Sequence, residues 1–331
     1  MSWRTVVVTG NAKLDYKMDY LVVRKAEATT RIFIGEIGLL IIESTAVSLT
    51  TMLLSELIKH KIKVVFCDEK HNPQSELISY YGSHDTSAKI RTQIQWTREV
   101  KENVWTEIVA EKVKQQSEHL KKYELKVPAD MLKQYIEEME LGDKTNREGH
   151  AAKVYFNALF GMDFSRSKDC AINAALNYGY GILLSCFNRE VIANGYITQL
   201  GLFHNNMFNQ FNLSSDLMEP FRILVDRIVV KNKPEKFDSE EKMNFIYMLE
   251  DEVMIDGKHQ YISNAIKIYC KSIFDALNEA NGIVASVKEH KPKDGLVQML
   301  VITEKQYSKM EYVVGEKGST IIDSDQRTII L

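Results

Sequence analysis

The chain has 331 residues, 45% of them apolar, so it can bury a large core and form more than one domain. Glycine and proline are scarce, at 16 and 5 residues, which argues against a long disordered region. The net charge of −3 excludes a uniformly basic nucleic-acid coat protein, but it allows a basic groove on one face.

The four cysteines are widely scattered, at Cys67, Cys170, Cys186 and Cys270. None forms a C-x-x-C pair, so the sequence predicts free thiols in a reducing compartment rather than a zinc site or a disulfide framework. The N-terminal stretch MSWRTVVVTG lacks the apolar segment of a signal peptide, and no apolar run approaches the roughly 18 residues of a membrane span. We therefore expect a cytoplasmic protein without a membrane anchor.

The first part of the chain predicts a small β-rich domain, residues 1–85. Short β-branched runs separated by turns predict strands at TVVVTG, YLVVRK, TRIFIG and LLIIES, and again at VVFCD. Between the last two, residues 48–61 carry apolar side chains at helical spacing, with Ser48 as a plausible N-cap.

The middle of the chain predicts an all-α domain, residues 86–285. From about residue 88 the apolar period becomes 3.6, and a long helix carries Trp105, Ile108 and Val109. Further helices are predicted around 128–140, 146–160, 167–190, 214–230, 239–252 and 260–280.

The last 46 residues return to a β–α–β pattern, with strands at LVQMLVIT and RTIIL around a short helix. This tail, residues 286–331, buries too little apolar surface to fold alone, so we expect it to be poorly ordered or docked by strand addition. The predicted fold class is therefore α+β and multidomain.

Three polar clusters interrupt the apolar helical pattern: NREGH with Glu148, GLFHNN with His204, and DLMEPFR with Asp216 and Glu219. Taken singly, each has an ordinary structural explanation. A carboxylate complements the first turn of a helix, a histidine can be a satisfied core residue, and an aspartate can cap a helix. The spacing of three between Asp216, Glu219 and Arg222 predicts that they share one helical face.

Taken together, the clusters indicate a metal site. Two carboxylates and one imidazole from three separate helices can form an open site for Mg²⁺ or Mn²⁺. Such sites neutralise phosphates and orient an oxygen nucleophile. From the spacing alone, this reading stays one of two alternatives, since the same groups can form a buried structural network.

Five stretches of the chain carry a resemblance to a known family: MSWRTVVVTGNAKLDYK, QIQWTREVKENVWTEIVAEKVKQQSEHL, NREGHAAKVYFNALFG, NAALNYGYGIL and GLFHNNMFNQFNLSSDLMEPFR. In this order they resemble the CRISPR adaptation integrases, metal-dependent DNA endonucleases that insert new spacers, and in particular their type II branch. The resemblance covers most of the chain, to about residue 284.

The resemblance implies site residues and partners. The family's metal ligands fall on Glu148, His204 and Glu219, with Asp216 as an acidic neighbour. The implied fold is an N-terminal β-sandwich-like domain that makes a homodimer, followed by the helical metal-binding domain. Two such dimers flank a small ferredoxin-like partner and hold double-stranded DNA, the incoming protospacer and the CRISPR repeat.

The tail, residues 286–331, resembles the C-terminal half of that ferredoxin-like partner, while the partner's N-terminal half is absent. A gene fusion with a deletion and a natural extension both stay open.

The implied reaction is a transesterification in which the 3′-hydroxyl of a DNA end attacks the repeat boundary. Basic residues predicted to hold the duplex are Arg91, Arg98, Lys112, Arg147, Lys153 and Arg222, with Gln93 and Gln95 as further candidates. For any one of them a solvated helix face is an alternative. Tyr178, Tyr180 and Asn173 could contact DNA or belong to the core.

Two other function classes compete with the integrase. One is a non-catalytic DNA-binding scaffold, in which the polar clusters are structural. The other is a metallohydrolase of small phosphoesters, which gives no reason for the β-rich dimer domain. The discriminating observation is whether Glu148, His204 and Glu219 converge on one point.

Overall fold

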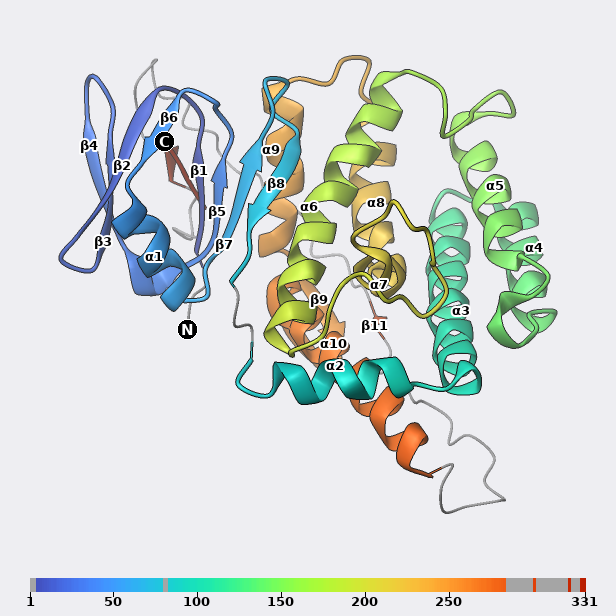
Figure 1. Ribbon diagram of the computed structural model, residues 1–331. Helices are drawn as coiled ribbons and strands as arrows, with labels where there is room; N and C mark the ends of the chain where they lie inside the picture. Colours follow the sequence, from blue (N-terminus) through green and yellow to red (C-terminus); the bar gives the residue numbers. More distant parts are fainter. Residues whose placement is uncertain (1–3, 80–82, 284–299, 302–320, 323–327) are drawn as a thin grey trace. The chain divides into compact units, whose positions relative to one another are not determined.

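The computed structural model describes residues 4–79, 83–283, 300–301, 321–322 and 328–331 (Figure 1). The chain divides into two compact units. The first comprises Met1–Tyr80 and Lys305–Leu331, and the second comprises Tyr81–Glu304. The first division lies near the predicted boundary at residue 85, and the boundary predicted at residue 285 lies outside the described residues.

The first unit is built from two β-sheets. The six-stranded sheet has the order β12 (Ile321–Ile322), β13 (Thr328–Ile330), β1 (Arg4–Val8), β5 (Ile37–Ile42), β7 (Lys63–Cys67) and β8 (Pro73–Leu77). The four-stranded sheet has the order β4 (Thr29–Phe33), β3 (Tyr20–Arg24), β2 (Ala12–Lys17) and β6 (Val47–Leu49). Parallel pairing of β1 with β5, and of β5 with β7, makes the centre of the larger sheet parallel.

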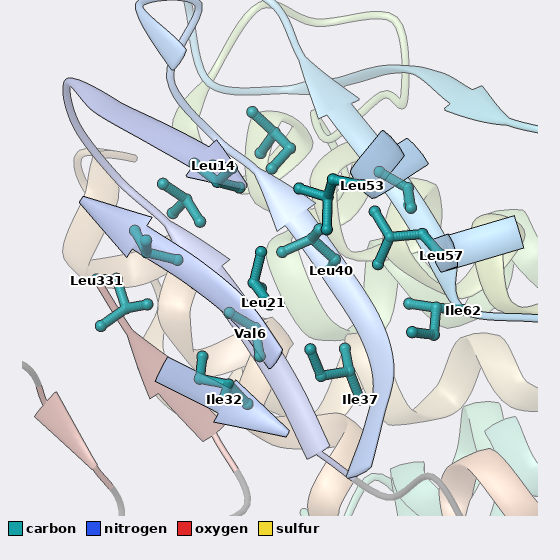
Figure 2. Packing of buried hydrophobic residues seen from close by; sticks show 14 of the residues in the cluster. Val6, Leu14, Leu21, Ile32, Ile37, Leu40, Leu53, Leu57, Ile62 and Leu331 are labelled. Atoms are coloured by element: carbon teal, nitrogen blue, oxygen red, sulfur yellow. The ribbon is translucent and has the colours of Figure 1, made fainter. Parts of the chain in front are cut away.

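Both sheets contribute to one apolar core (Figure 2). Val6 and Leu40 from the larger sheet pack with Leu14 and Leu21 from the smaller one, and helix α1 (Thr51–Lys59) adds Leu53. This arrangement confirms the predicted β-sandwich-like N-terminal domain.

Two details of this unit differ from the expectation. Thr50, not Ser48, caps α1, because its hydroxyl accepts a hydrogen bond from the Leu53 N–H at 3.3 Å. The second detail concerns the apolar stretch over residues 30–44, in the domain that the resemblance implies makes a homodimer. Most of its large apolar side chains are buried within the unit itself, and Phe33, 43% exposed, is the exception on β4.

The C-terminal strand β13 joins the larger sheet beside β1. The two strands are parallel, with Thr5 opposite Thr328 and Val7 opposite Ile330. The Leu331 N–H donates to the Val7 carbonyl at 2.8 Å. Ile329 and Leu331 are buried in the core, so docking of the tail by strand addition is confirmed for the described residues 328–331. The helix predicted within the tail lies outside the described residues.

The second unit is mainly helical, as predicted. Its helices are α2 (Thr86–Gln95), α3 (Arg98–Lys122), α4 (Lys126–Glu137), α5 (Arg147–Phe160), α6 (Ala171–Ala193), α7 (Asn212–Leu217), α8 (Arg222–Asn232), α9 (Ser239–Tyr247) and α10 (Ile262–Ile283). The long helix α3 buries Trp105, Ile108 and Val109, as its period predicts. The hairpin of β9 (Glu252–Ile255) and β10 (Lys258–Tyr261) was not predicted, whereas β11 (Leu300–Val301), which pairs with β9, lies within the strand predicted at LVQMLVIT.

The single helix predicted over residues 214–230 is wrong. The segment forms α7, the 3₁₀ turn η3 (Glu219–Phe221) and α8, so Asp216, Glu219 and Arg222 do not lie along one continuous helix. Pro220 explains the break, because proline has no N–H to donate and its ring clashes with the preceding turn. Glu219 and Arg222 nevertheless meet at the predicted spacing of three, with Arg222 Nε 2.9 Å from Glu219 Oε1, whereas Asp216 bonds to His204.

No helix in the described residues is long and apolar enough to cross a membrane. The four cysteines are free thiols, as predicted.

Candidate active site

Glu148 lies in the first turn of α5, where the sequence placed it. Asn146 caps this helix, and its side chain accepts a hydrogen bond from the Gly149 N–H at 3.3 Å. The buried Asp143 carboxylate accepts from the N–H groups of Arg147 and Glu148 at 2.7 and 3.0 Å. The start of the helix is therefore held at two points, which fixes the backbone that carries Glu148.

Glu219 is the first residue of η3, directly before Pro220, and its side chain is buried. Its two oxygens have different partners. Arg222 Nε donates to Oε1 at 2.9 Å, and Lys112 Nζ, from α3, donates to Oε2 at 2.5 Å. The same Lys112 ammonium also donates to Glu148 Oε1. Two carboxylates separated by 71 residues in sequence (219 − 148) therefore meet at one buried cation.

The electrostatics agree with this pairing. Burial by itself would lower the pKa of Lys112, but the charges of Glu219 and Glu148 outweigh it and raise the pKa above its usual value. Burial also works against ionisation of Glu219, yet Arg222 and Lys112 lower its pKa to about 2. Lys112 is therefore an ammonium and Glu219 a carboxylate at neutral pH.

His204 lies in the loop between α6 and α7, not on a helix as predicted. Its Nδ1 is 2.5 Å from Asp216 Oδ1. The Asp216 carboxylate, fully buried, also accepts from the backbone N–H groups of Leu202, Phe203 and His204 at 2.6, 3.1 and 3.1 Å. Asp216 is thus neither an N-cap nor a mere acidic neighbour, because it holds both the loop and the imidazole.

The loop requires glycine at position 201. A Cβ there would lie 2.4 Å from the His204 carbonyl oxygen and 2.7 Å from Asp216 Oδ2, both closer than real contacts allow. Gly201 therefore lets the backbone approach the Asp216 carboxylate. On its other side the loop packs Phe203 flat against Trp105, with ring centroids 4.7 Å apart and planes at 4°.

The His204 imidazole is close enough to Glu148 and Glu219 for their charges to affect its pKa. The hydrogen bond to Asp216 is the main cause that raises the pKa of His204. Desolvation opposes it, and the charges of Asp216, Glu219 and Glu148 add to it. A carboxylate that fixes one imidazole nitrogen is the arrangement that orients a metal-binding histidine through its other nitrogen.

The donor set can be compared with the needs of a divalent cation. Glu148 and Glu219 each direct one oxygen at the Lys112 ammonium, so the position between the two carboxylates binds a positive charge. Hard carboxylate oxygens with one imidazole suit Mg²⁺ or Mn²⁺. In the described part of the chain, however, no three acidic, histidine or cysteine side chains gather closely enough to hold a metal. The predicted convergence is therefore met by Glu148 and Glu219, whose shared position Lys112 occupies, and not by His204, although the donor types fit the ion.

The predicted DNA-contacting residues fall into three groups. Arg91, Arg98 and Lys153 are exposed, although Arg98 is paired with Glu102 at 2.6 Å. Arg147 is half-buried, pairs with Glu138 at 2.8 Å and lies over the Tyr135 ring. Lys112 and Arg222 face the carboxylates instead of solvent.

The remaining candidates from the sequence are structural in their contacts. Gln93 is buried and bonds to the backbone of Ile197 and Leu200, whereas Gln95 is exposed. Tyr178, Tyr180 and Asn173 are buried. The helical period places Lys112 on the same face of α3 as the buried Trp105 and Ile108, but the sequence does not show which carboxylates it meets.

The comparisons with known proteins decide the family. The family model of CRISPR associated protein Cas1 matches residues 5–254. The chain belongs to the Cas1 family. It is 32% identical over 230 residues to a CRISPR-associated endonuclease Cas1 of Neisseria meningitidis, covering 70% of this chain and 76% of that protein.

Solved structures agree on the Cas1 fold. A Cas1 protein from Thermotoga maritima matches with a TM-score of 0.69 at 16% identity, covering 82% of this chain and 96% of the other. A casposase bound to an integration product matches with a TM-score of 0.65 at 18% identity, covering 85% and 91%. At these identities the likeness shows a common fold, an N-terminal β domain followed by a helical domain.

This Cas1 chain also resembles a second kind of protein. It is 36% identical over 74 residues to a CRISPR-associated endoribonuclease Cas2 of Treponema denticola, covering 22% of this chain and 72% of that protein.

Proposed function

We propose that this chain is a Mg²⁺- or Mn²⁺-dependent DNA endonuclease and integrase that inserts short foreign duplexes as spacers into a CRISPR array. Its support is membership of the Cas1 family together with one observation: Glu148 and Glu219, from separate elements, share a buried cation position. Glu148, Glu219 and His204 would hold the ion. When bound, it would neutralise the non-bridging oxygens of a phosphodiester during attack by a DNA 3′-hydroxyl or by water.

The chain's own residues prepare this chemistry. Arg222 holds one oxygen of Glu219 and leaves the other directed at the shared position. Asp216 fixes His204 through Nδ1, which sets the ring orientation and leaves Nε2 for the site. Lys112 balances the two carboxylates in the arrangement seen here, and we propose that it withdraws when the divalent cation binds.

The position of cleavage must come from how the duplex is held, because phosphodiesters are chemically alike. We propose Arg91, Arg98 and Lys153 as the exposed cations that contact its backbone, with Arg147 beside them. A homodimer through the β-rich unit would extend the path across subunits, and the exposed Phe33 on the edge strand β4 belongs to that proposed interface.

We further propose that the Cas2-like segment lies at the C-terminal end of the chain. The Cas1 match ends at residue 254, which leaves 77 residues (331 − 254), and the Cas2 likeness spans 74. On this proposal the adaptation partner is a small Cas2-type, ferredoxin-like protein, part of which is fused to this chain.

A second candidate function is a non-catalytic DNA-binding scaffold of the same complex. The observation that favours it is the Lys112 ammonium itself, which satisfies both carboxylates without a divalent cation. In that case the site is a structural ion-pair network.

A strand-transfer assay separates the two candidates. A labelled short duplex and a repeat-containing plasmid are incubated with the protein, with and without Mn²⁺ and a separate Cas2-type partner. The integrase proposal expects Mn²⁺-dependent joining that Glu148→Gln removes, whereas Glu140→Gln, at an exposed glutamate outside the proposed site, preserves it. DNA binding without joining, equal in wild type and Glu148→Gln, would instead establish the scaffold.

A further inference from the structure

A buried carboxylate behind the site has no part in the arrangement described so far. Asp226 lies on α8 four residues after Arg222, so the two side chains share a helix face, and Asp226 is 1% exposed. A buried aspartate is costly unless hydrogen bonds satisfy it. Its partners therefore show what it does.

The first partner connects Asp226 to the site. The Tyr180 hydroxyl, from α6, donates to Asp226 Oδ1 at 2.5 Å. The guanidinium of Arg222 lies over the Tyr180 ring, 4.5 Å from its centroid, and Arg222 Nε donates to Glu219 Oε1 at 2.9 Å. An unbroken set of contacts thus leads from Asp226 through a tyrosine ring and an arginine to Glu219.

A second tyrosine, Tyr155 on α5, lies within electrostatic range of Asp226. Burial and then the charge of Asp226 raise the pKa of the Tyr155 hydroxyl well above its usual value. The Tyr155 hydroxyl oxygen lies 2.6 Å from His119 Nδ1 on α3. Tyr155 thus has its hydrogen-bond partner on α3, whereas Tyr180 is the tyrosine that bonds to Asp226.

We propose that Tyr180 and Asp226 are positioning residues for Glu219. Asp226 holds the Tyr180 hydroxyl, the fixed ring gives Arg222 a face to lie on, and Arg222 keeps Glu219 Oε1 turned away from the shared cation position. The other oxygen, Oε2, is then the one presented to that position. A planar guanidinium suits this role because it can stack on a ring and donate in its own plane at once.

The effect of these residues on metal affinity rests on the proposed function, because it presupposes that Glu219 binds the divalent cation. Tyr180→Phe and Tyr155→Phe form a matched pair, because each removes one buried tyrosine hydroxyl that interacts with the charge of Asp226 and keeps the ring. Only Tyr180 contacts Arg222. Mn²⁺ binding to the full chain is measured by electron paramagnetic resonance, with thermal melts as a check on folding.

We expect Tyr180→Phe to weaken Mn²⁺ binding about 10-fold, the lower end of the effect of losing an outer-shell partner. Tyr155→Phe should leave Mn²⁺ binding unchanged while lowering the melting temperature. Unchanged binding in Tyr180→Phe, or equal weakening in both variants, would overturn the inference, since equal weakening indicates a merely structural role.

Crystal structures of the metal-free wild type and Tyr180→Phe give a readout that does not depend on metal binding. The inference expects Arg222 to leave its place over the ring and Glu219 to rotate. Unmoved side chains would overturn it. A wild-type protein that binds no Mn²⁺ would defeat the proposed function, while the crystal comparison would still decide the positioning role.

Discussion

Lys112 Nζ lies 2.5 Å from Glu219 Oε2, and the same ammonium reaches Glu148 from the middle of α3. A lysine thus occupies the point to which two predicted metal ligands direct their oxygens. In the absence of a divalent cation this ammonium is what keeps the two carboxylates together.

Lys112→Met should make folding depend on metal. Removing one partner of a buried ion pair costs about 3 kcal/mol or more, because the other charges stay buried and unpaired. Mn²⁺ should recover much of this loss, so the rise of the melting temperature on adding MnCl₂ should be larger than in wild type. Lys114→Met is the control, since Lys114 on the same helix pairs with Glu111 away from the site. An equal Mn²⁺ response in wild type and Lys112→Met would contradict the shared position.

Glu148→Ala, His204→Ala and Glu219→Ala should each remove Mn²⁺-dependent DNA cleavage and strand transfer. The expected loss is at least about 100-fold, the upper end of what loss of an outer-shell partner causes. Circular dichroism should show an unchanged helical content for Glu148→Ala, because the Glu148 side chain is 27% exposed and that of Glu219 only 5%. Full activity in a folded Glu219→Ala protein would refute the ligand assignment.

Asp216→Ala should destabilise the fold, because Asp216 is more than the acidic neighbour that the resemblance implies. The substitution leaves the N–H groups of Leu202, Phe203 and His204 without their acceptor. The free energy of unfolding should fall by about 3 kcal/mol, since each buried unsatisfied donor costs about 1–3 kcal/mol. Urea denaturation measures it, with the exposed Asp163→Ala as control. A fall no larger than the control's would show that the loop does not depend on Asp216.

Asp226 should make stability depend on pH. Burial raises its pKa from 3.8 to about 6, so the folded protein holds this proton more tightly than the unfolded chain. The associated stabilisation, about 3 kcal/mol, is complete below pH 3.8 and is lost as the pH rises through about 6. Asp226→Asn should lack this contribution. Between pH 4 and pH 7 the urea midpoint should therefore change with pH by different amounts in wild type and in Asp226→Asn. Parallel curves would show that Asp226 does not titrate there.

Ile329→Asp should destabilise the β-rich unit and leave DNA cleavage intact. Ile329 is buried in the core, whereas its neighbour Ile330 points to the other face of the strand and is half-buried. A buried charge at position 329 should cost about 3 kcal/mol, and Ile330→Asp should cost clearly less. Thermal melts and cleavage assays of the pair check this. Equal melting temperatures for the two variants would mean that β13 is not part of the sheet in solution.

Much of this architecture follows from local sequence. Alternating and β-branched runs predicted most strands of the first unit, and the period of 3.6 predicted the helices, because burial on one side imposes a period that each segment carries by itself. The position of Glu148 in the first turn of a helix was likewise predicted from the local sequence. The quoted motifs also predicted Glu148, His204 and Glu219 as a group, through family resemblance.

Other features required the tertiary structure. Lys112 lies 36 residues from Glu148 and 107 from Glu219, so the helical period places it on the buried face of α3 but does not show which carboxylates it meets. Pro220 indicates that the helix breaks near residue 220. That Asp216 then faces the loop of His204 depends on how α7 packs.

The strand beside β1 is the plainest case. Thr328–Ile330 reads from sequence only as a short apolar strand, and its parallel pairing with β1, more than 300 residues away, is decided by which sheet edge remains open in the folded unit. Local pattern specifies what a segment can form. The groups that it meets are specified by the chain as a whole, because contacts between distant segments exist only after the core has closed.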